Sequence, residues 1–385
     1  MSYDVTSRER ATLHNANKFK VGLFAANLSS GRTATLIPER WSGSWPDNLR
    51  LARMADDAGL DFMLPLARWK GYGGDTDYQG TGLETFTWTS GLLASTQRMT
   101  VFATVHAPLF NPVIAAKACA TADHIGNGRF GLNLVVGWNE DEFAMFGVQQ
   151  REHEQRYEYG QEWLDAVKRM WSSEEDFDVD GKYIKLKGVR AKPKPVGGVR
   201  PLLMNAGASP VGRAFAVRNT DAFFIQASRV SNDETAGNVK KAKDLACEYD
   251  RDIDVYTVAS ITCRRSRKEA EEYYRYAVLD NADFSAIDGL LALKDITPAK
   301  VGVEEFEKQR RLYTIGYSGK PIIGDPDDIA EALAAFSGAG LTGIGLSFVN
   351  YLDELPFFNE EVLPRLERRG LRVPKRERPR MATTR

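Results

Sequence analysis

The first apolar stretch of the chain and the turn behind it read FKVGLFAANL over residues 19–28, and they decide between two α/β folds. Residues 19–24 have the composition of a buried strand. A doubly wound sheet that binds a dinucleotide would continue with a glycine-rich turn, G-x-G-x-x-G, directly after this strand. Residues 24–28 supply none of those glycines. We therefore expect the alternative arrangement of strands and helices, a (β/α)8 TIM barrel.

Short apolar runs alternate with amphipathic stretches along the rest of the chain, a pattern typical of a parallel sheet wrapped by helices. After the first strand, we expect strands at residues 62–64, 100–105, 129–136, 201–205, 222–225, 255–262 and 343–348. We expect helices at residues 48–58, 84–96, 114–124, 157–171, 211–218, 234–249, 268–279, 329–336 and 360–368. There are roughly eight of each, which suits one barrel domain over residues 18–373.

Two segments interrupt this alternation, and we expect both to be insertions. Residues 172–200 show strand-like alternation around Asp180-Gly181, a hairpin turn signal. Residues 280–319 are mixed and charged, and we expect them to supply a mobile lid. The polar ends are predicted to be a disordered N-terminal tail over residues 1–17 and a basic C-terminal tail over residues 374–385.

Composition narrows the class of protein. Lys plus Arg is 51 and Asp plus Glu is 52, so the chain lacks the basic excess of a nucleic-acid binder or of a protein drawn to anionic membranes. No run is long and apolar enough to cross a bilayer, and the N-terminus lacks the apolar core of a signal peptide. The three cysteines are far apart and have no C-x-x-C spacing, which argues against disulfides and a zinc site. We expect a cytoplasmic protein that acts on a small molecule.

Three polar residues stand at or near the predicted carboxyl ends of barrel strands, where barrel enzymes place their chemistry. Asn133 interrupts an otherwise apolar strand, and a buried amide without a partner costs about 1–3 kcal/mol. Asn133 is therefore either bonded to core backbone or faces a polar ligand in the barrel mouth. Thr104 ends the preceding strand, where threonine is also a common strand residue. His106 follows that strand in a loop expected to face the mouth.

Residues 205–210, NAGASP, follow a strand and open a helix. Ser209 is well placed as the N-cap and Pro210 as the first helical residue. Taken alone, the segment is best interpreted as an ordinary capped helix. The second interpretation is an anion site, because a helix N-terminus presents N–H groups and barrels often hold phosphate in their later loops.

Other charged and aromatic residues are open to two interpretations. Arg68 and Arg156 are either phosphate or ring-edge partners or solvated surface charges. Of the acidic residues 140–142, we expect only one to be functional. Four aromatic residues are placed to wall in a planar ligand: Trp69, Tyr72, Trp138 and Tyr157. No H-E-x-x-H spacing is present around any of the four histidines, so we expect no metal site.

At these positions the chain resembles the bacterial-luciferase-like, flavin-dependent monooxygenases, and in particular the branch of the pyrimidine oxygenases and dimethylsulfone monooxygenases. The resemblance covers about residues 19–371. It rests on the motifs KGYGG at 70–74, LETF at 83–86, GRFGLNLVVGW at 128–138, RY at 156–157, AGAS at 206–209 and YLDEL at 351–355.

The resemblance implies positions for the cofactor FMN and for oxygen. The FMN-binding residues would be Ala67, Arg68, Asn133, Glu142, Arg156, Tyr157, Gly207 and Ser209. Thr104 and Asn133 would handle O2, and His106, which replaces a small residue of the pyrimidine oxygenases, would reshape the substrate pocket.

The resemblance also implies a two-component reaction. A separate NAD(P)H:flavin reductase would supply FMNH2, and the substrate would be oxygenated through a flavin–oxygen adduct. We expect the substrate to be a nitrogen heterocycle, with a small organosulfur compound such as a sulfone as the alternative. A homo-oligomer, either a dimer or a tetramer, is also expected. Two other classes are considered: a deazaflavin-dependent hydride-transfer enzyme, and a phosphate-binding hydrolase or lyase without flavin.

Overall fold

A closed parallel sheet forms the centre of the computed structural model, which describes residues 12–316 and 320–374. Eight strands follow one another around the barrel, and the pairing of the sixth with the seventh completes the ring. They are β1 (Lys20–Phe24), β2 (Phe62–Leu64), β3 (Thr100–His106), β4 (Phe130–Val135), β7 (Leu202–Asn205), β8 (Ala222–Phe224), β9 (Asp254–Cys263) and β11 (Gly343–Ser347). The predicted (β/α)8 barrel is confirmed.

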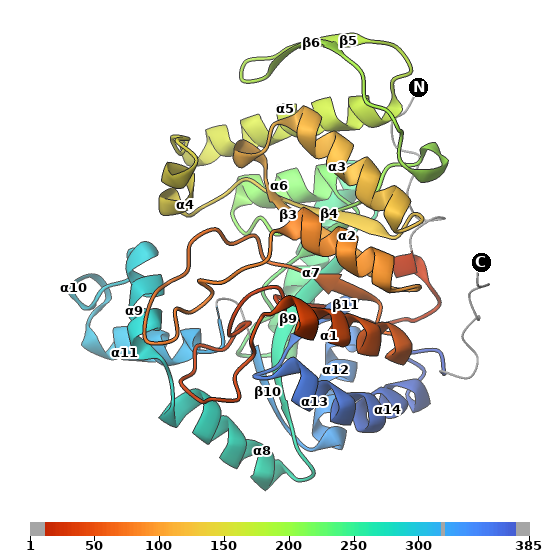
Figure 1. Cartoon of the computed structure of the whole chain (residues 1–385). Helices are drawn as coiled ribbons and strands as arrows, with labels where there is room; N and C mark the ends of the chain where they lie inside the picture. The colour runs from red at the N-terminus through yellow and green to blue at the C-terminus, as the bar shows by residue number, and fades with distance from the viewer. Residues whose placement is uncertain (1–11, 317–319, 375–385) are drawn as a thin grey trace.

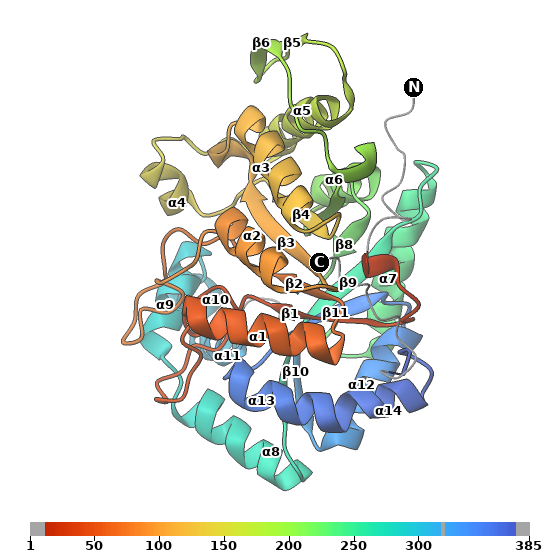
Figure 2. The same ribbon diagram turned by 45° about the vertical axis from the view of Figure 1, so that its right-hand side comes forward.

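Helices surround the strands (Figures 1 and 2). Those of the barrel are α1 (Trp45–Ala58), α2 (Thr85–Ser95), α3 (Pro112–Ile125), α5 (His153–Ser172), α6 (Pro210–Asn219), α7 (Asn232–Cys247), α8 (Arg267–Tyr274), α12 (Pro326–Gly338), α13 (Tyr351–Phe357) and α14 (Leu363–Arg368). A short α4 (Glu140–Met145), which the sequence did not predict, follows β4. No described helix combines the length and the apolar character needed to cross a membrane.

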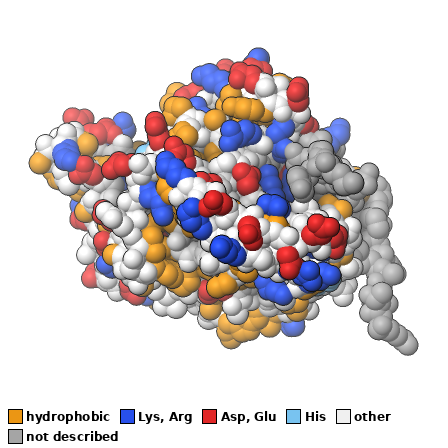
Figure 3. Space-filling view, turned by 90° about the horizontal axis from the view of Figure 1, so that it is seen from above, with side chains coloured by type: hydrophobic (Ala, Val, Ile, Leu, Met, Phe, Trp, Pro, Cys, Tyr) orange, Lys and Arg blue, Asp and Glu red, His pale blue; other side chains and the backbone are white. Residues whose placement is uncertain are grey.

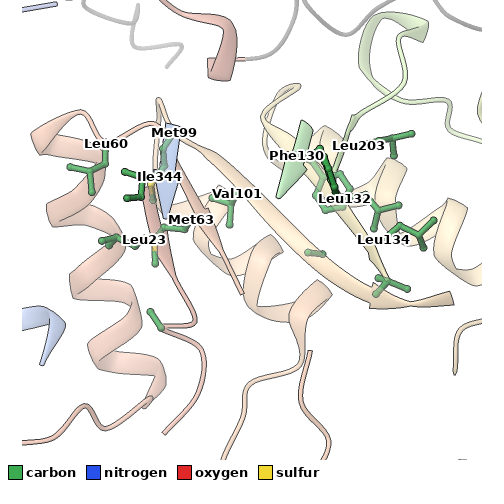
Figure 4. Close-up of a cluster of buried hydrophobic side chains, with 14 of the residues drawn as sticks. Leu23, Leu60, Met63, Met99, Val101, Phe130, Leu132, Leu134, Leu203 and Ile344 are labelled. Atoms are coloured by element: carbon green, nitrogen blue, oxygen red, sulfur yellow. The ribbon is translucent and has the colours of Figure 1, made fainter. Parts of the chain in front are cut away.

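Side chains along each strand alternate between two buried layers. Outward residues pack under the helices, as Leu23, Val101 and Leu132 do in the cluster of Figure 4. Inward residues fill the lower barrel with rings, and Phe62 lies edge-on to Phe102 and Tyr256, with ring centroids 6.2 and 5.7 Å apart. Since the lower interior is filled by these rings, a ligand must enter from the carboxyl ends of the strands.

The first insertion contains the expected hairpin. β5 (Phe177–Asp180) pairs antiparallel with β6 (Lys185–Val189), and the pair projects beyond α5 at the top of Figure 1. On the face shown in Figure 3, basic and acidic side chains are interspersed, in line with the balanced composition.

The second insertion is helical where the structure describes it. It forms α9 (Phe284–Leu293), α10 (Pro298–Val301) and α11 (Val303–Tyr313), which lie together on one side of the barrel (Figure 1). It leads into an extra strand, β10 (Lys320–Gly324), that pairs with the last residues of β9 outside the ring. The sequence did not predict this strand.

Residues 12–17 differ from the expected N-terminal tail. Leu13 is buried, and the Asn17 side-chain amide donates a hydrogen bond of 2.7 Å to the carboxylate of Asp61. These contacts hold residues 12–17 against the barrel. The remainder of the predicted tails, residues 1–11 and 375–385, lies outside the described residues.

Candidate active site

A hydrogen-bonded pair of polar side chains lies above the aromatic rings inside the barrel. Thr104 and Asn133 stand opposite each other in the register of β3 and β4. The Nδ2 of Asn133 donates to the Oγ1 of Thr104 at 3.1 Å, and that hydroxyl donates to the carbonyl of Pro65 at 2.6 Å. Since the single hydroxyl hydrogen is used at Pro65, Thr104 fixes the orientation of the Asn133 amide. The buried Oδ1 of Asn133 has no hydrogen-bond partner among the described residues.

His106 is the last residue of β3 and points inward like Thr104, two positions before it. The pKa of His106 is lowered to about 4, chiefly by burial; the negative charge of Glu142 opposes this shift and the positive charge of Arg68 adds to it. The imidazole is therefore neutral at pH 7. Its Nδ1 is buried without a hydrogen-bond partner in the described part of the chain.

A buried ion pair forms one wall of the mouth. Arg68, in the loop after β2, donates to the carboxylate of Glu142 on α4 at 3.0 Å, and the two side chains are 6% and 2% exposed. The same carboxylate oxygen accepts the backbone N–H of Trp69 at 2.8 Å. The Arg68 guanidinium also lies over the rings of Tyr72 and Trp138, 4.8 and 5.6 Å from their centroids. Glu142 thus anchors the loop after β2, where Ala67 is also buried, and its neighbour Asp141 adds an exposed ion pair to Lys70 of the same loop.

A second group of polar side chains gathers at the N-terminus of α6. Ser209 is the N-cap, and its Oγ accepts the N–H of Gly212 at 3.2 Å. The His153 Nε2 lies 2.9 Å from the same oxygen, and the His153 Nδ1 lies 3.0 Å from a guanidinium nitrogen of Arg156. A guanidinium only donates, so Nδ1 accepts and Nε2 carries the proton that is donated to Ser209.

Two further contacts hold this group, the α6 cradle, against the end of β4. Arg156 donates to the carbonyl of Gly137 at 2.7 Å. The Asn205 amide donates to the carbonyl of Leu134 at 2.6 Å and accepts the N–H of Gly207 at 2.8 Å. A Cβ on Gly207 would lie 2.7 Å from the backbone of α6, so only glycine permits this close turn. The cradle has a positive helix end and an arginine, which suits a phosphate.

Several buried polar atoms around the mouth have no hydrogen-bond partner among the described residues. They are Arg68 Nε, His106 Nδ1, Asn133 Oδ1, Asn139 Nδ2 and Arg156 Nε. Arg68 follows β2, His106 and Asn133 lie on β3 and β4, Asn139 is the N-cap of α4, and Arg156 lies on α5. Because unsatisfied buried polar atoms are costly, the five atoms at this end of the barrel are candidates to bind a polar ligand. No cluster of residues that could hold a metal ion occurs in the part of the chain that the structure describes.

Comparison with known proteins agrees with the observed fold. The family model for luciferase-like monooxygenases matches residues 19–343. The chain belongs to the luciferase-like monooxygenase family.

Relatives of this luciferase-like monooxygenase span almost its whole length. It is 28% identical to the FMNH2-dependent dimethylsulfone monooxygenase of Pseudomonas fluorescens, over 90% of this chain and 93% of the relative. It is 26% identical to the pyrimidine monooxygenase RutA of Acinetobacter baylyi, over 90% and 94% of the two chains. Among solved structures, a long-chain alkane monooxygenase shares the fold, with a TM-score of 0.82, 19% identity and coverage of 94% of both chains.

The helical insertion of the monooxygenase is docked on the loop after β2. The carboxylate of Asp283 accepts the backbone N–H and the hydroxyl of Thr76 at 2.9 and 2.7 Å. Ala286 and Leu290 of α9 pack with Tyr78 of that loop. The insertion therefore forms part of the mouth, and its mobility stays a prediction.

Two residues near the site were not predicted from the sequence. His153 was not among the predicted site residues, yet it precedes Arg156 by three positions and Tyr157 by four. This spacing puts all three on one helix face, and the rings of His153 and Tyr157 lie 5.5 Å apart. Lys294, from the second insertion, lies over the ring of Trp138, and no signal in the sequence connected these two residues.

Proposed function

We propose that the chain is the oxygenase of a two-component system: it binds FMNH2 in the barrel mouth and uses O2 to oxygenate a small organic substrate, in the first place a nitrogen heterocycle. The observation that carries this proposal is the joint presence of a phosphate-compatible cradle and of unpartnered buried polar atoms at the same barrel end. The FMNH2-dependent sulfone monooxygenase and the pyrimidine monooxygenase among the relatives support it.

The residues present fit FMN. In the proposal, Ser209, Arg156, Tyr157 and Gly207 hold the phosphate, with His153 orienting the hydroxyl of Ser209. Ala67, Arg68, Glu142 and Asn133 border the ring. Reduced FMN, when bound, supplies the electrons that activate O2.

The residues of the chain orient the reacting groups, shield them from water and polarise them. Thr104 holds the Asn133 amide in one orientation, and both side chains are buried above the packed aromatic rings. A preorganised polar group in such a site acts more strongly on developing charge than it would in water. His106 is neutral and presents Nδ1 to the same space, so we assign it to contact with the substrate.

The proposal extends to partners and assembly. With no dinucleotide turn after β1, a separate NAD(P)H:flavin reductase must deliver FMNH2. A homo-oligomer, dimer or tetramer, is supported by α2, which lies on the outside of the barrel and has no charged residue between Thr85 and Ser95. A cytoplasmic location agrees with the three free cysteines. We also propose a single barrel domain over residues 18–373.

One alternative substrate is a small sulfone, since a dimethylsulfone monooxygenase is 28% identical. A deazaflavin-dependent hydride transfer is disfavoured because the relatives named above are monooxygenases.

Equilibrium titration of the full chain with FMN under reducing conditions, followed by admission of air with a candidate substrate, tests the proposal. We expect FMNH2 to bind and oxygen to appear in the product. A chain that binds no FMNH2 at the α6 cradle would contradict it.

A further inference from the structure

A further unpartnered polar atom belongs to Trp69, in the loop after β2. The residue is half-buried, but its Nε1 atom is buried and has no hydrogen-bond partner among the described residues. An indole N–H only donates a hydrogen bond, and a buried donor without an acceptor is costly. A ligand that reaches Trp69 therefore gains affinity if it carries an acceptor atom.

Three phenylalanine rings continue from Trp69 and hold it in place. The Trp69 ring lies edge-on to that of Phe146, the residue after α4, with centroids 4.9 Å apart, and it is tilted against that of Phe110 at 6.3 Å. Phe110 lies edge-on to Phe86 of α2 at 5.8 Å. This row of rings, Phe86, Phe110, Trp69 and Phe146, is here called the aromatic wall. Phe86 is buried and Phe146 is exposed, so the wall runs from the interior to the surface and gives the Trp69 N–H apolar surroundings.

Trp69 lies on the side of the loop that is nearer to the residue assigned to the substrate. Its neighbour Arg68 places its guanidinium over the ring of Tyr72. The Trp69 ring packs instead against Phe110, and a single short helical turn separates Phe110 from His106, the last residue of β3. The phosphate-compatible group, the α6 cradle, is built on other elements. Trp69 is thus placed to contact the substrate together with His106.

The ion pairs of this loop favour an uncharged ligand group. Arg68 is paired with Glu142 at 3.0 Å, and Lys70 is paired with Asp141 at 2.7 Å. Since each of these pairs is neutral as a whole, neither supplies a counter-charge for an anion buried at Trp69. A neutral acceptor needs no counter-charge, and it costs less to bury.

We propose that Trp69 selects the substrate by donating its indole N–H to an uncharged oxygen, either a carbonyl or a sulfonyl oxygen, while the aromatic wall packs against the apolar part of the same molecule. The inference rests on the proposed function and narrows its substrate class. Heterocycles without a carbonyl group and sulfides, which lack such an oxygen, then bind less tightly.

Matched probes that differ in the acceptor oxygen test this assignment by calorimetric titration of the full chain, saturated with FMNH2 in the absence of O2. The pairs are 4-pyrimidinone with pyrimidine, and dimethyl sulfone with dimethyl sulfide. The pair that shows a preference distinguishes a carbonyl from a sulfonyl oxygen. We expect the wild type to bind the oxygen-bearing member of one pair about tenfold more tightly, because the other member leaves a buried donor unpaired.

Two variants complete the test. Trp69→Phe keeps an aromatic ring in the wall but removes the N–H, and we expect it to lose the preference. Trp45→Phe removes an indole N–H from α1, where Trp45 is 38% exposed, and we expect it to keep the preference. The affinity for FMNH2 is measured on the same preparations, and an unchanged affinity in Trp69→Phe shows that the variant is folded.

Each result decides the proposal. A preference that is equally large in wild type and Trp69→Phe overturns it, as does a wild type without a preference in either pair. A Trp69→Phe variant that binds FMNH2 about tenfold more weakly would assign the N–H to the cofactor, and this result also overturns the proposal. Failure of the wild type to bind FMNH2 would remove the proposed function, and the same probe titrations on the chain alone would then decide the role of Trp69.

Discussion

The amide of Asn133 donates a hydrogen bond to the hydroxyl of Thr104, and that hydroxyl donates a hydrogen bond to the carbonyl of Pro65. The donor and the acceptor in these two hydrogen bonds determine which polar atom is left for a ligand. Thr104 cannot donate to a ligand while it donates to Pro65. The polar atom of this pair that remains available to a ligand is therefore the Oδ1 of Asn133. Thr104 is therefore a positioning residue as the structure stands.

Replacing Thr104 by Val removes the acceptor that holds the Asn133 amide and keeps the shape of the strand. We expect product formed per O2 consumed to fall roughly a hundredfold, because a preorganised group in a dry site is worth about 3 kcal/mol. FMN affinity should change little. Thr104→Ser, which keeps the hydroxyl, is the control. Coupling of O2 to product that is as good in the valine variant as in wild type would show that Thr104 is only a strand residue.

Substitution of Ser209 tests how a negative charge at the α6 cradle affects FMN binding, while the helix keeps its N-cap. Aspartate is as good an N-cap as serine, so Ser209→Asp should fold normally. Its negative charge should nevertheless repel a phosphate, and we expect FMN affinity to fall at least about tenfold further than in Ser209→Ala. Equilibrium titration of both variants measures this difference. Equal affinity in wild type and both variants would place the phosphate elsewhere.

His106 should make the fold sensitive to acid. The folded-state pKa of His106, about 4, lies below the ordinary value of 6.5. His106 is therefore protonated at a lower pH in the folded chain than in the unfolded chain. The stability due to neutral His106 is complete above pH 6.5 and is lost as the pH falls towards 4, by roughly 3 kcal/mol in total. Urea unfolding at pH 7 and pH 4.5 should show a smaller loss for His106→Leu than for wild type. His124→Gln, at an exposed histidine, controls for general acid effects, and a loss unchanged by His106→Leu would contradict the prediction.

Electron supply distinguishes a two-component enzyme from a self-sufficient one. With purified chain, FMN and NADH, we expect no sustained NADH oxidation above the rate without the chain. Addition of a flavin reductase should start substrate oxygenation. Oxygen consumption and product are followed together, and steady NADH oxidation by the chain alone would falsify the two-component proposal.

Much of the barrel was predictable because its strands are buried and apolar. Their positions agree with the expected ones to within one or two residues, as for β2 at Phe62–Leu64. β10 was missed for a physical reason. It contains Pro321 and ends at Gly324, both unusual in a central strand, but it pairs only with β9 among the described strands, and an edge position tolerates them.

The site was predictable as a set of positions but not as a set of bonds. Thr104, His106 and Asn133 could be placed near the barrel mouth because they stand at or near the carboxyl ends of predicted strands. The bond from Thr104 to Pro65 crosses 39 residues of chain, and the ion pair of Arg68 with Glu142 crosses 74. Such bonds depend on which strands become neighbours in the fold, and a local sequence pattern does not predict strand neighbours.

The bonds from Thr76 to Asp283 tie two segments that lie 207 positions apart in the chain. One of them follows the second barrel strand and the other precedes the extra strand. In the folded protein they share a carboxylate and a buried apolar cluster, and neither can be replaced without leaving the other unsatisfied. For protein engineering, the transferable module is this pair of segments: substrate range should be exchanged between relatives by grafting both together.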